Sequence, residues 1–223
     1  MAAMTPEPWE RAVSDGYELD LRELLRDAAR ALRGSKRVVW AGVLAWLAIS
    51  VAVAAVTWAL GLGDMVSAAL GVLATAPVTV GLSMVGARRA AGLAVSLADL
   101  GAYRAATGHA AIVLLIHLLV VVGGEAATGP VGSLLLSTTY GLFASLALFL
   151  VADRGLSGPR AIAVSAQLVL ARWPTLLALQ LVLAGALAVA ALPFGLGLIW
   201  AVPFVLIAQG AVYVRAVGLS ASG

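Results

Sequence analysis

The segment WPTLLALQLVLAGALAVAALPFGLGLIWAVPFVLIAQGAVYV, residues 173–214, contains no Asp, Glu, Lys, Arg or His. As one helix it would be about 63 Å long, roughly twice the ~30 Å hydrocarbon core of a bilayer. Turn-forming residues interrupt it at one place, where Pro193 is followed by Gly195 and Gly197. The segment therefore predicts a transmembrane hairpin with an uncharged tip.

The composition of the whole chain agrees with this prediction. Of its 223 residues, 62% are hydrophobic and only 11% are charged, which leaves too little polar surface for a soluble fold. The absence of cysteine excludes disulfides, thiolate metal sites and thiol nucleophiles. The net charge is only +3 and the basic residues flank apolar runs, so they indicate membrane orientation rather than nucleic-acid binding. We expect an all-α integral membrane protein.

Four more apolar runs precede the segment 173–214 and predict further membrane spans. They cover residues 38–62, 65–87, 109–122 with their flanks, and 131–152. Turns are expected at residues 61–64 and in a longer loop at 123–130, both rich in glycine. Together with the last hairpin, these runs predict six transmembrane helices arranged as three hairpins.

Each hairpin is preceded by a segment with the pattern of an amphipathic helix. Residues 19–33 carry Leu21, Leu25, Ala28 and Leu32 at helical spacing, with charged residues opposite, and Gly34 follows as a candidate C-cap. Residues 90–103 and 157–172 have similar patterns, the latter with an apolar stripe of Ile162, Ala166 and Val169. We expect three helices on the cytoplasmic membrane surface, the first of which either contacts anionic lipids or binds a partner. Residues 1–18 are expected to be a disordered or loosely ordered tail, and residues 19–223 a single membrane domain.

The charges suggest an orientation for this arrangement. In the six-span interpretation, all 14 Lys and Arg lie on one side of the membrane, whereas the opposite loops hold only Asp64 and Glu125. The positive-inside rule then places both termini in the cytoplasm. At the basic side, Asp99 with Arg104 and Asp153 with Arg154 are expected to tie the surface helices to the hairpins.

The first and last hairpins share a pattern that predicts an internal repeat. Five residues recur at a constant offset: Gly71, Pro77, Arg89, Ala90 and Gly92 match Gly197, Pro203, Arg215, Ala216 and Gly218. The predicted units are residues 19–92, 93–158 and 159–218. Pro77 and Pro203 are expected to kink their helices and to free backbone carbonyls that neighbours must satisfy. They either widen a central cavity or only fit curved helices together.

The last hairpin also resembles a known group. Trp173-Pro174, the stretch from Leu192 through Pro193 to Pro203, and a closing Tyr213-Val214-Arg215-Ala216 resemble the last hairpin of uncharacterised bacterial six-span membrane proteins. This hairpin is similar to that of the membrane domain attached to some glycerophosphodiester phosphodiesterases. The resemblance covers about the last 50 residues. It implies a membrane domain without a known catalytic site. The phosphodiesterase catalytic domain is missing from the chain, so the resemblance does not imply that activity.

Few side chains that could support chemistry lie at membrane depth. His117 lies in the middle of the third predicted span, and His109 lies near its boundary. His117 is either a neutral histidine hydrogen-bonded to a neighbouring helix or a proton-relay or substrate contact. Deep neutral side chains are expected to bond between helices or to line a solute path: Gln180, Gln209, Thr138, Thr139, Tyr140, Thr57, Thr75 and Thr79. A serine hydrolase at Ser133, Ser137 or Ser145 is not favoured.

These patterns point to a function without catalysis. The first hypothesis is an inner-membrane scaffold or accessory subunit of a complex, with a protein partner or a second copy as its contact. Alanines four residues apart, such as Ala41 and Ala45, would allow close helix approach within the fold or to that partner. The alternative is a permease or transporter subunit for a neutral or lipid-like solute. Neither hypothesis needs a metal or a cofactor, and neither involves nucleic acid.

Overall fold

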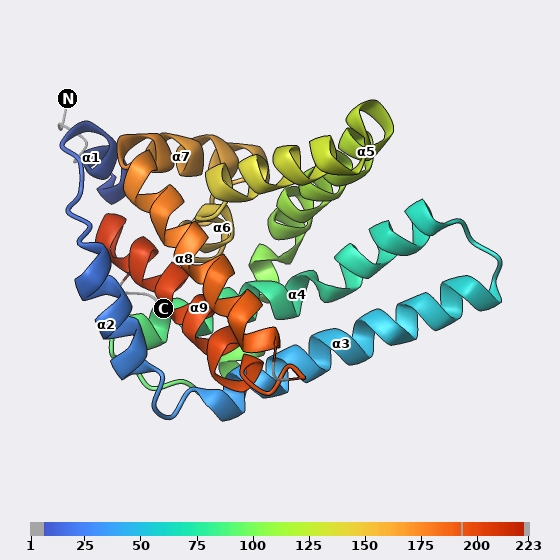
Figure 1. Ribbon diagram of the computed structural model, residues 1–223, viewed down its shortest axis with the longest axis horizontal. Coiled ribbons are helices and arrows are strands. Elements are labelled where there is room, and N and C mark those ends of the chain that lie inside the picture. The colour runs from blue at the N-terminus through green and yellow to red at the C-terminus, as the bar shows by residue number, and fades with distance from the viewer. Residues whose placement is uncertain (1–6, 193, 221–223) are drawn as a thin grey trace.

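The computed structural model describes residues 7–192 and 194–220, and within these it contains helices and no strand (Figure 1). In chain order the helices are α1 Pro8–Ser14, α2 Leu21–Ala31, α3 Lys36–Ala59, α4 Asp64–Ala90, η1 Leu97–Gly101, η2 Arg104–Ala106, α5 Thr107–Phe143, α6 Ala147–Arg154, α7 Gly158–Ala171, α8 Trp173–Ala191 and α9 Leu198–Ala216. The two η elements are short 3₁₀-helices.

Five helical segments of the described chain are long and apolar enough to cross a membrane. They are Lys36–Ala59, Asp64–Ala90, Leu97–Arg154, Trp173–Ala191 and Leu198–Ala216. Their exposed surface carries many large apolar side chains, as expected for helices that contact lipid. The chain is therefore an all-α, multi-pass membrane protein.

α3 and α4 form the first hairpin, as the sequence predicts. Gly61 takes a positive φ of 65° between them, a conformation that glycine adopts without steric cost. Near the tip, the hydroxyls of Thr57 and Ser67 lie 2.7 Å apart and hydrogen-bond one helix to the other. The predicted spans 38–62 and 65–87 are thus confirmed as helices.

α5 is a second hairpin whose turn is tighter than the predicted loop 123–130. The helix continues through most of that loop and reverses at Gly129, which has φ 72° and ψ −175°. Across the reversal, the Ser133 hydroxyl donates to the Val121 carbonyl at 2.7 Å, and the Tyr140 hydroxyl donates to the Val113 carbonyl at 2.9 Å. The prediction of an extended outer loop is wrong because a single Gly-Pro step is enough to turn the chain.

The second limb of α5 is not continuous with α6. The helix breaks at residues 144–146, and the Ser165 side chain on α7 fills the break. Its hydroxyl donates to the Phe143 carbonyl at 2.7 Å and accepts from the Leu146 amide at 3.1 Å. The predicted span 131–152 is therefore two helices joined by a buried serine from a third.

α8 and α9 form the last hairpin. Pro193, part of its predicted turn, lies outside the described residues, and Phe194 and Gly195 beside it both have positive φ angles of 51° and 76°. α9 packs closely on α4 where Gly86 faces Gly210. A Cβ atom at either glycine would collide with the backbone of the other helix, so this contact depends on the missing side chains.

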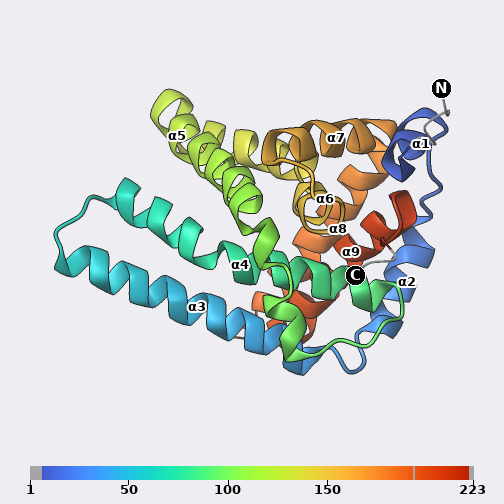
Figure 2. The ribbon, with the colours of Figure 1, turned by 180° about the vertical axis from the view of Figure 1, so that it is seen from behind.

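The three hairpins do not run side by side. Figures 1 and 2 show α3, α4 and α5 extending away from the N-terminal helices, whereas α8 and α9 cross their direction. The start of α9 lies against the start of α3: Lys36 Nζ is 4.7 Å from the centre of the Trp200 ring, and Trp40 Nε1 donates to the Ile199 carbonyl at 3.1 Å. The sequence interpretation placed Lys36 and the α8–α9 tip at opposite membrane faces, and these contacts do not fit that arrangement.

The N-terminal segment is ordered where the structure describes it, which corrects the prediction of a loose tail. Trp9, Ala12 and Tyr17 are buried, and the Tyr17 hydroxyl donates to the Leu168 carbonyl of α7 at 3.0 Å. The Arg172 guanidinium in turn donates to the Tyr17 carbonyl at 2.7 Å. Residues 1–6 lie outside the described part of the chain.

α2 is an amphipathic helix, but its apolar face packs on protein. Leu24 and Ala28 are almost completely buried in the main core. Two arginines, which occupy matching positions in the predicted repeat, hold α2 in place. Arg215 donates to the Asp27 carboxylate at 2.7 Å, and Arg89 donates to the carbonyls of Ala31 and Arg33. The prediction that this apolar face lies in the membrane is therefore not supported.

The other two predicted surface helices differ from expectation. Residues 90–103 are not one helix, because α4 extends to Ala90, Gly92 turns the chain, and η1 begins only at Leu97. The third is present as α7, but its buried face contains Val164 and Leu168 rather than the predicted stripe of Ile162, Ala166 and Val169, of which Val169 alone is buried.

Ion pairs connect the helix ends at the basic side. Asp153, with a side chain only 2% exposed, pairs with Arg154 at 3.0 Å as predicted and also accepts from the Tyr213 hydroxyl at 2.6 Å. Asp99 pairs with Arg88 at 3.6 Å and not with the expected Arg104. α6 and α9 are thus joined at a buried carboxylate.

Candidate functional site

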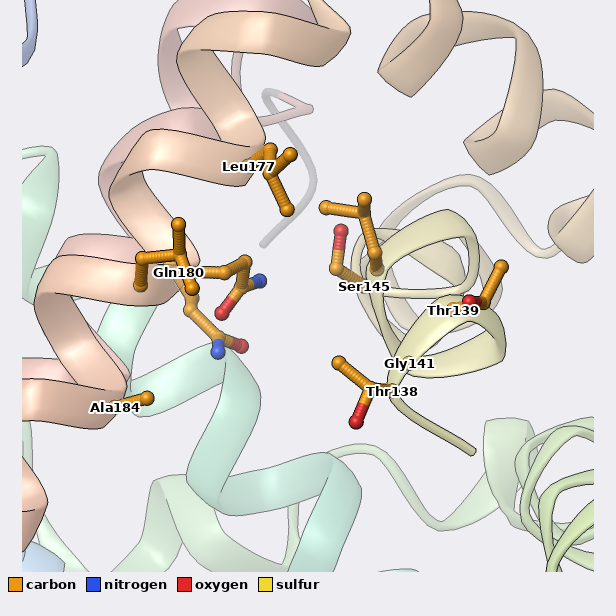
Figure 3. A pocket seen from close by; sticks show the side chains of 10 residues that line it. Thr138, Thr139, Gly141, Ser145, Leu177, Gln180 and Ala184 are labelled. Carbon is orange, nitrogen blue, oxygen red and sulfur yellow. The ribbon is translucent and has the colours of Figure 1, made fainter. Parts of the chain in front are cut away.

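The candidate site is a cavity of about 390 Å³ between the second limb of α5 and the α8–α9 hairpin (Figure 3). Its lining residues are Thr138, Thr139, Gly141, Leu142, Ser145, Leu177, Gln180, Leu181, Ala184 and Gln209. This volume lies within the range of small-molecule sites in proteins, roughly 300 to 1,000 Å³. The cavity opens between helices rather than at a helix end, since the rim residue Leu181 is 66% exposed.

Helical spacing explains why these side chains share one cavity. On α8, Leu177, Gln180, Leu181 and Ala184 recur at intervals of three or four, so they lie on one face of the helix. Gln209 on α9 lies across from them. Gln180 is about 10 Å along α8 from its first residue, which places its amide within the apolar part of the helix.

The facing wall comes from α5 and from the break that follows it. Thr138 and Leu142 lie one turn apart on the second limb of α5. Ser145 lies inside the break at residues 144–146 that Ser165 stabilises. Figure 3 shows Thr138 and Ser145 on this wall and the Gln180 side chain on the other, all directed into the space between them.

Four of the five polar side chains that line the cavity have no hydrogen-bond partner within the described residues, whereas the fifth, Thr139, bonds to its own helix. Among residues 7–192 and 194–220, the side chains of Thr138, Ser145, Gln180 and Gln209 make no hydrogen bond. Two amides and two hydroxyls thus offer both donors and acceptors to the cavity. In an apolar environment such groups cost free energy unless something inside the cavity bonds to them.

Several other hydroxyls of the long helices, including that of Thr139 at the cavity, are satisfied locally, although the buried hydroxyl of Thr107 in α5 has no partner in the described residues. Thr75, Thr79 and Thr139 each donate to the carbonyl one turn earlier in their own helix, at 2.7 to 3.0 Å. The prediction that Thr75 and Thr79 bond between helices is therefore wrong, whereas Thr57 and Tyr140 do bridge two helical limbs. The unpartnered groups of the cavity differ in this respect from the satisfied hydroxyls of Thr75, Thr79 and Thr139.

Among the described residues, no charged side chain lines the cavity. Its remaining surface is mainly aliphatic, from Leu142, Leu177 and Leu181. An ionised ligand would lose its hydration on entering the cavity and would find no opposite charge there, so its binding would cost free energy. The arrangement suits an uncharged molecule that has a small hydrogen-bonding group and an apolar body.

The two histidines that the sequence singled out lie elsewhere. His109 is exposed in the first turn of α5, and His117 packs its ring against Tyr140, with ring centres 5.2 Å apart. His117 makes no hydrogen bond within the described chain, so the expected bond to a neighbouring helix is absent there. In the same part of the chain, no group of three His, Asp or Glu side chains could hold a metal ion.

The two candidate kink residues do not line the cavity, so they do not widen it directly. Pro203 is buried in α9, and Pro77 is half-buried in α4. Pro203 does free the Ile199 carbonyl, because it lacks the amide that would bond there, and Trp40 Nε1 from α3 satisfies that carbonyl. The expectation that neighbouring helices satisfy freed carbonyls is confirmed here.

Sequence reasoning found three of the four unpartnered polar residues, namely Gln180, Gln209 and Thr138. Ser145 was considered only as a nucleophile and set aside, because nothing local in the sequence shows the helix break that turns it inward. The aliphatic wall was missed as well. Its signal, the spacing of Leu177, Leu181 and Ala184 around Gln180, is hidden in a helix that is apolar on every side.

Comparisons of the chain with protein-family models, with curated proteins and with solved structures found no match to any of them. The resemblance of the last hairpin to bacterial six-span proteins therefore stays a prediction.

Proposed function

We propose that the protein binds an uncharged, lipid-like molecule in the cavity between α5, α8 and α9, as a non-enzymatic permease or accessory subunit of a bacterial inner membrane. The proposal counts the two limbs of α5 as separate crossings and places both termini in the cytoplasm. One observation carries it: four polar side chains that have no partner within the described residues meet in an apolar cavity that these residues line without a charge and that opens between membrane helices.

The position of the opening supports a lipid-like ligand over a water-soluble one. The rim residues Leu181, Thr138 and Ala184 are exposed, and they belong to the apolar segments of α8 and α5. A molecule in the bilayer can reach this opening sideways without crossing water. Its polar group would then replace the water that the amides and hydroxyls otherwise require.

Filling the cavity with a larger side chain tests the proposal. Two glycines serve as substitution site and matched control. Both Gly141 in α5 and Gly185 in α8 have open space where a Cβ atom would lie, but only Gly141 lines the cavity. We expect Gly141→Leu to reduce photolabelling by a diazirine-bearing diacylglycerol several-fold and Gly185→Leu to leave it unchanged. Labelled peptides should contain residues 138–145 and 177–184.

Competition defines the specificity of the site. Excess unlabelled diacylglycerol should suppress the labelling, whereas phosphatidylglycerol, which is charged, should not. Labelling spread evenly over the lipid-exposed helices and unaffected by Gly141→Leu would refute the proposed site.

A scaffold function is the second candidate. Ala45, Ala48 and Ala52 on α3 are exposed and do not bring helices together within the protein. Such a small-residue face is available to a partner helix. Purification in a mild detergent tests it: a protein that co-purifies in a fixed ratio, and is lost in an Ala48→Phe variant, would favour the scaffold.

A further inference from the structure

The outer face of α2 and of its connection to α3 carries a row of exposed arginines. Arg22, Arg26, Arg30, Arg33 and Arg37 follow one another at intervals of three or four residues. The opposite face of α2 is buried in the protein core through Leu24 and Ala28. The row is therefore turned outward from the protein.

Within the described residues, three of these arginines neither form an ion pair nor lie close enough to a carboxylate to favour its charged form. Arg30 pairs with Asp27 at 3.0 Å, and Arg22 lies close enough to Asp20 to favour its carboxylate. Asp27 and Glu23 also pair with Arg215. Within the described chain Arg26, Arg33 and Arg37 form no ion pair, and we call these three residues the arginine stripe.

The connection to α3 fixes where the arginine stripe lies relative to the membrane. Arg37 belongs to the first turn of α3, one of the helices long and apolar enough to cross a bilayer. Lys36 and Trp40 lie in the first two turns of α3. Lys36 contacts Trp200 and Trp40 contacts Ile199, both at the start of α9 beside the α8–α9 tip. Tryptophan beside basic residues is typical of the membrane–water interface.

We propose that the arginine stripe binds the phosphate groups of anionic phospholipids. Guanidinium groups bond phosphate oxygens in a bidentate manner, and basic residues directly outside a membrane helix attract anionic headgroups. The site is separate from the cavity, so this proposal does not depend on the proposed function. If so, anionic lipid stabilises the position of α2. Because Arg89 and Arg215 connect α2 to the ends of α4 and α9, the lipid also stabilises those two helix ends.

Fluorescence quenching in vesicles tests the proposal. A variant that keeps Trp40 and Trp200 as its only tryptophans is reconstituted into phosphatidylcholine with increasing amounts of brominated phosphatidylglycerol, and then into brominated phosphatidylcholine for comparison. The ratio of the two quenching constants gives the preference for anionic lipid. One basic residue near an anionic surface is worth about fivefold in binding. We expect the triple variant Arg26→Gln, Arg33→Gln, Arg37→Gln to lose the preference by at least that factor.

Arg104→Gln is the matched control, because Arg104 is also exposed and also forms no ion pair in the described residues. It should keep the preference of the parent, and 1 M salt should weaken that preference in both. Two results would overturn the proposal. If the triple variant keeps its preference for anionic lipid, the arginine stripe does not bind lipid phosphate and a soluble acidic partner becomes the better candidate. If Arg104→Gln loses as much of the preference as the triple variant, the effect comes from the overall surface potential and not from the arginine stripe.

Discussion

At the scale of single residues, a hydrogen bond between two helices compensates for a proline. Pro203 removes the amide that would bond the Ile199 carbonyl, and the Trp40 indole takes its place at 3.1 Å. An unpaired carbonyl in an apolar environment is costly, so the tryptophan and the proline depend on each other. The sequence predicted that a partner must exist but could not identify it, because the two residues are far apart in the chain.

We therefore expect Trp40→Phe to lower the free energy of unfolding by about 1 to 3 kcal/mol. In a Pro203→Ala background, α9 can bond its own Ile199 carbonyl, so the same substitution should cost clearly less. Thermal unfolding in detergent measures both values. Trp58→Phe, at a side chain exposed to 85%, serves as the control. Equal costs in the two backgrounds would show that the indole acts only by packing.

Tyr17 gives the N-terminal segment a predicted dependence on pH. Burial raises the pKa of its phenol from the usual 10.0 to about 12, so the fold favours the neutral form. The stabilisation is fully present below pH 10 and is lost as the pH rises toward 12. Cleavage of residues 8–20 by an alkaline protease, corrected with an unfolded peptide of the same sequence, should accelerate in that interval.

Tyr17→Phe provides the control for this prediction. It keeps the buried ring but removes both the titrating group and the bond to the Leu168 carbonyl. Cleavage should be faster at neutral pH and should show no step between pH 10 and 12. A step that persists in this variant would assign the effect to another group.

At the scale of elements, glycine and proline made the hairpins predictable. Gly61 and Gly129 adopt positive φ angles at two reversals, and such residues are visible in a sequence. Gly92, Gly155 and Gly218 are equally spaced along the chain and follow α4, α6 and α9 with φ angles of 78°, 64° and 75°. The break before α6 was not predictable, because its polar groups are satisfied by Ser165 of another helix.

Ser165→Ala should therefore destabilise the middle of the protein. It leaves the Phe143 carbonyl and the Leu146 amide without the partner that Ser165 provides in a buried position. Each unpaired group should lower the free energy of unfolding by about 1 to 3 kcal/mol. Because the break places Ser145 in the cavity, the same variant should also reduce diacylglycerol photolabelling. Ser137→Ala, which removes only a bond within its own helix, should do neither.

At the scale of the whole molecule, the number of apolar helices was easier to predict than their directions. α8 has apolar residues on every side, so neither its sequence nor its composition indicates which side packs and which meets lipid. The charges predicted a common direction for all hairpins, and Lys36 against Trp200 contradicts it for the last one. Such contacts depend on shape, for example on the close approach of Gly86 and Gly210, rather than on hydropathy.

Cross-linking in native membranes distinguishes the two arrangements, and the absence of cysteine gives a clean background. In the structure, the pair Lys36→Cys and Trp200→Cys lies close enough for a short bis-maleimide. If the three hairpins instead ran parallel with their tips together, Trp200→Cys would meet Ser67→Cys near the α3–α4 tip. We expect the first pair to cross-link and the second to remain separate.

Labelling of single-cysteine variants with a membrane-impermeant maleimide assigns each site to a side of the membrane. Ser67→Cys should react from outside the cell, and Ser157→Cys should react only after permeabilisation. The reverse result would exchange the two faces of the protein and move the arginine stripe away from the cytoplasm, while the contact between α3 and α9 would still hold.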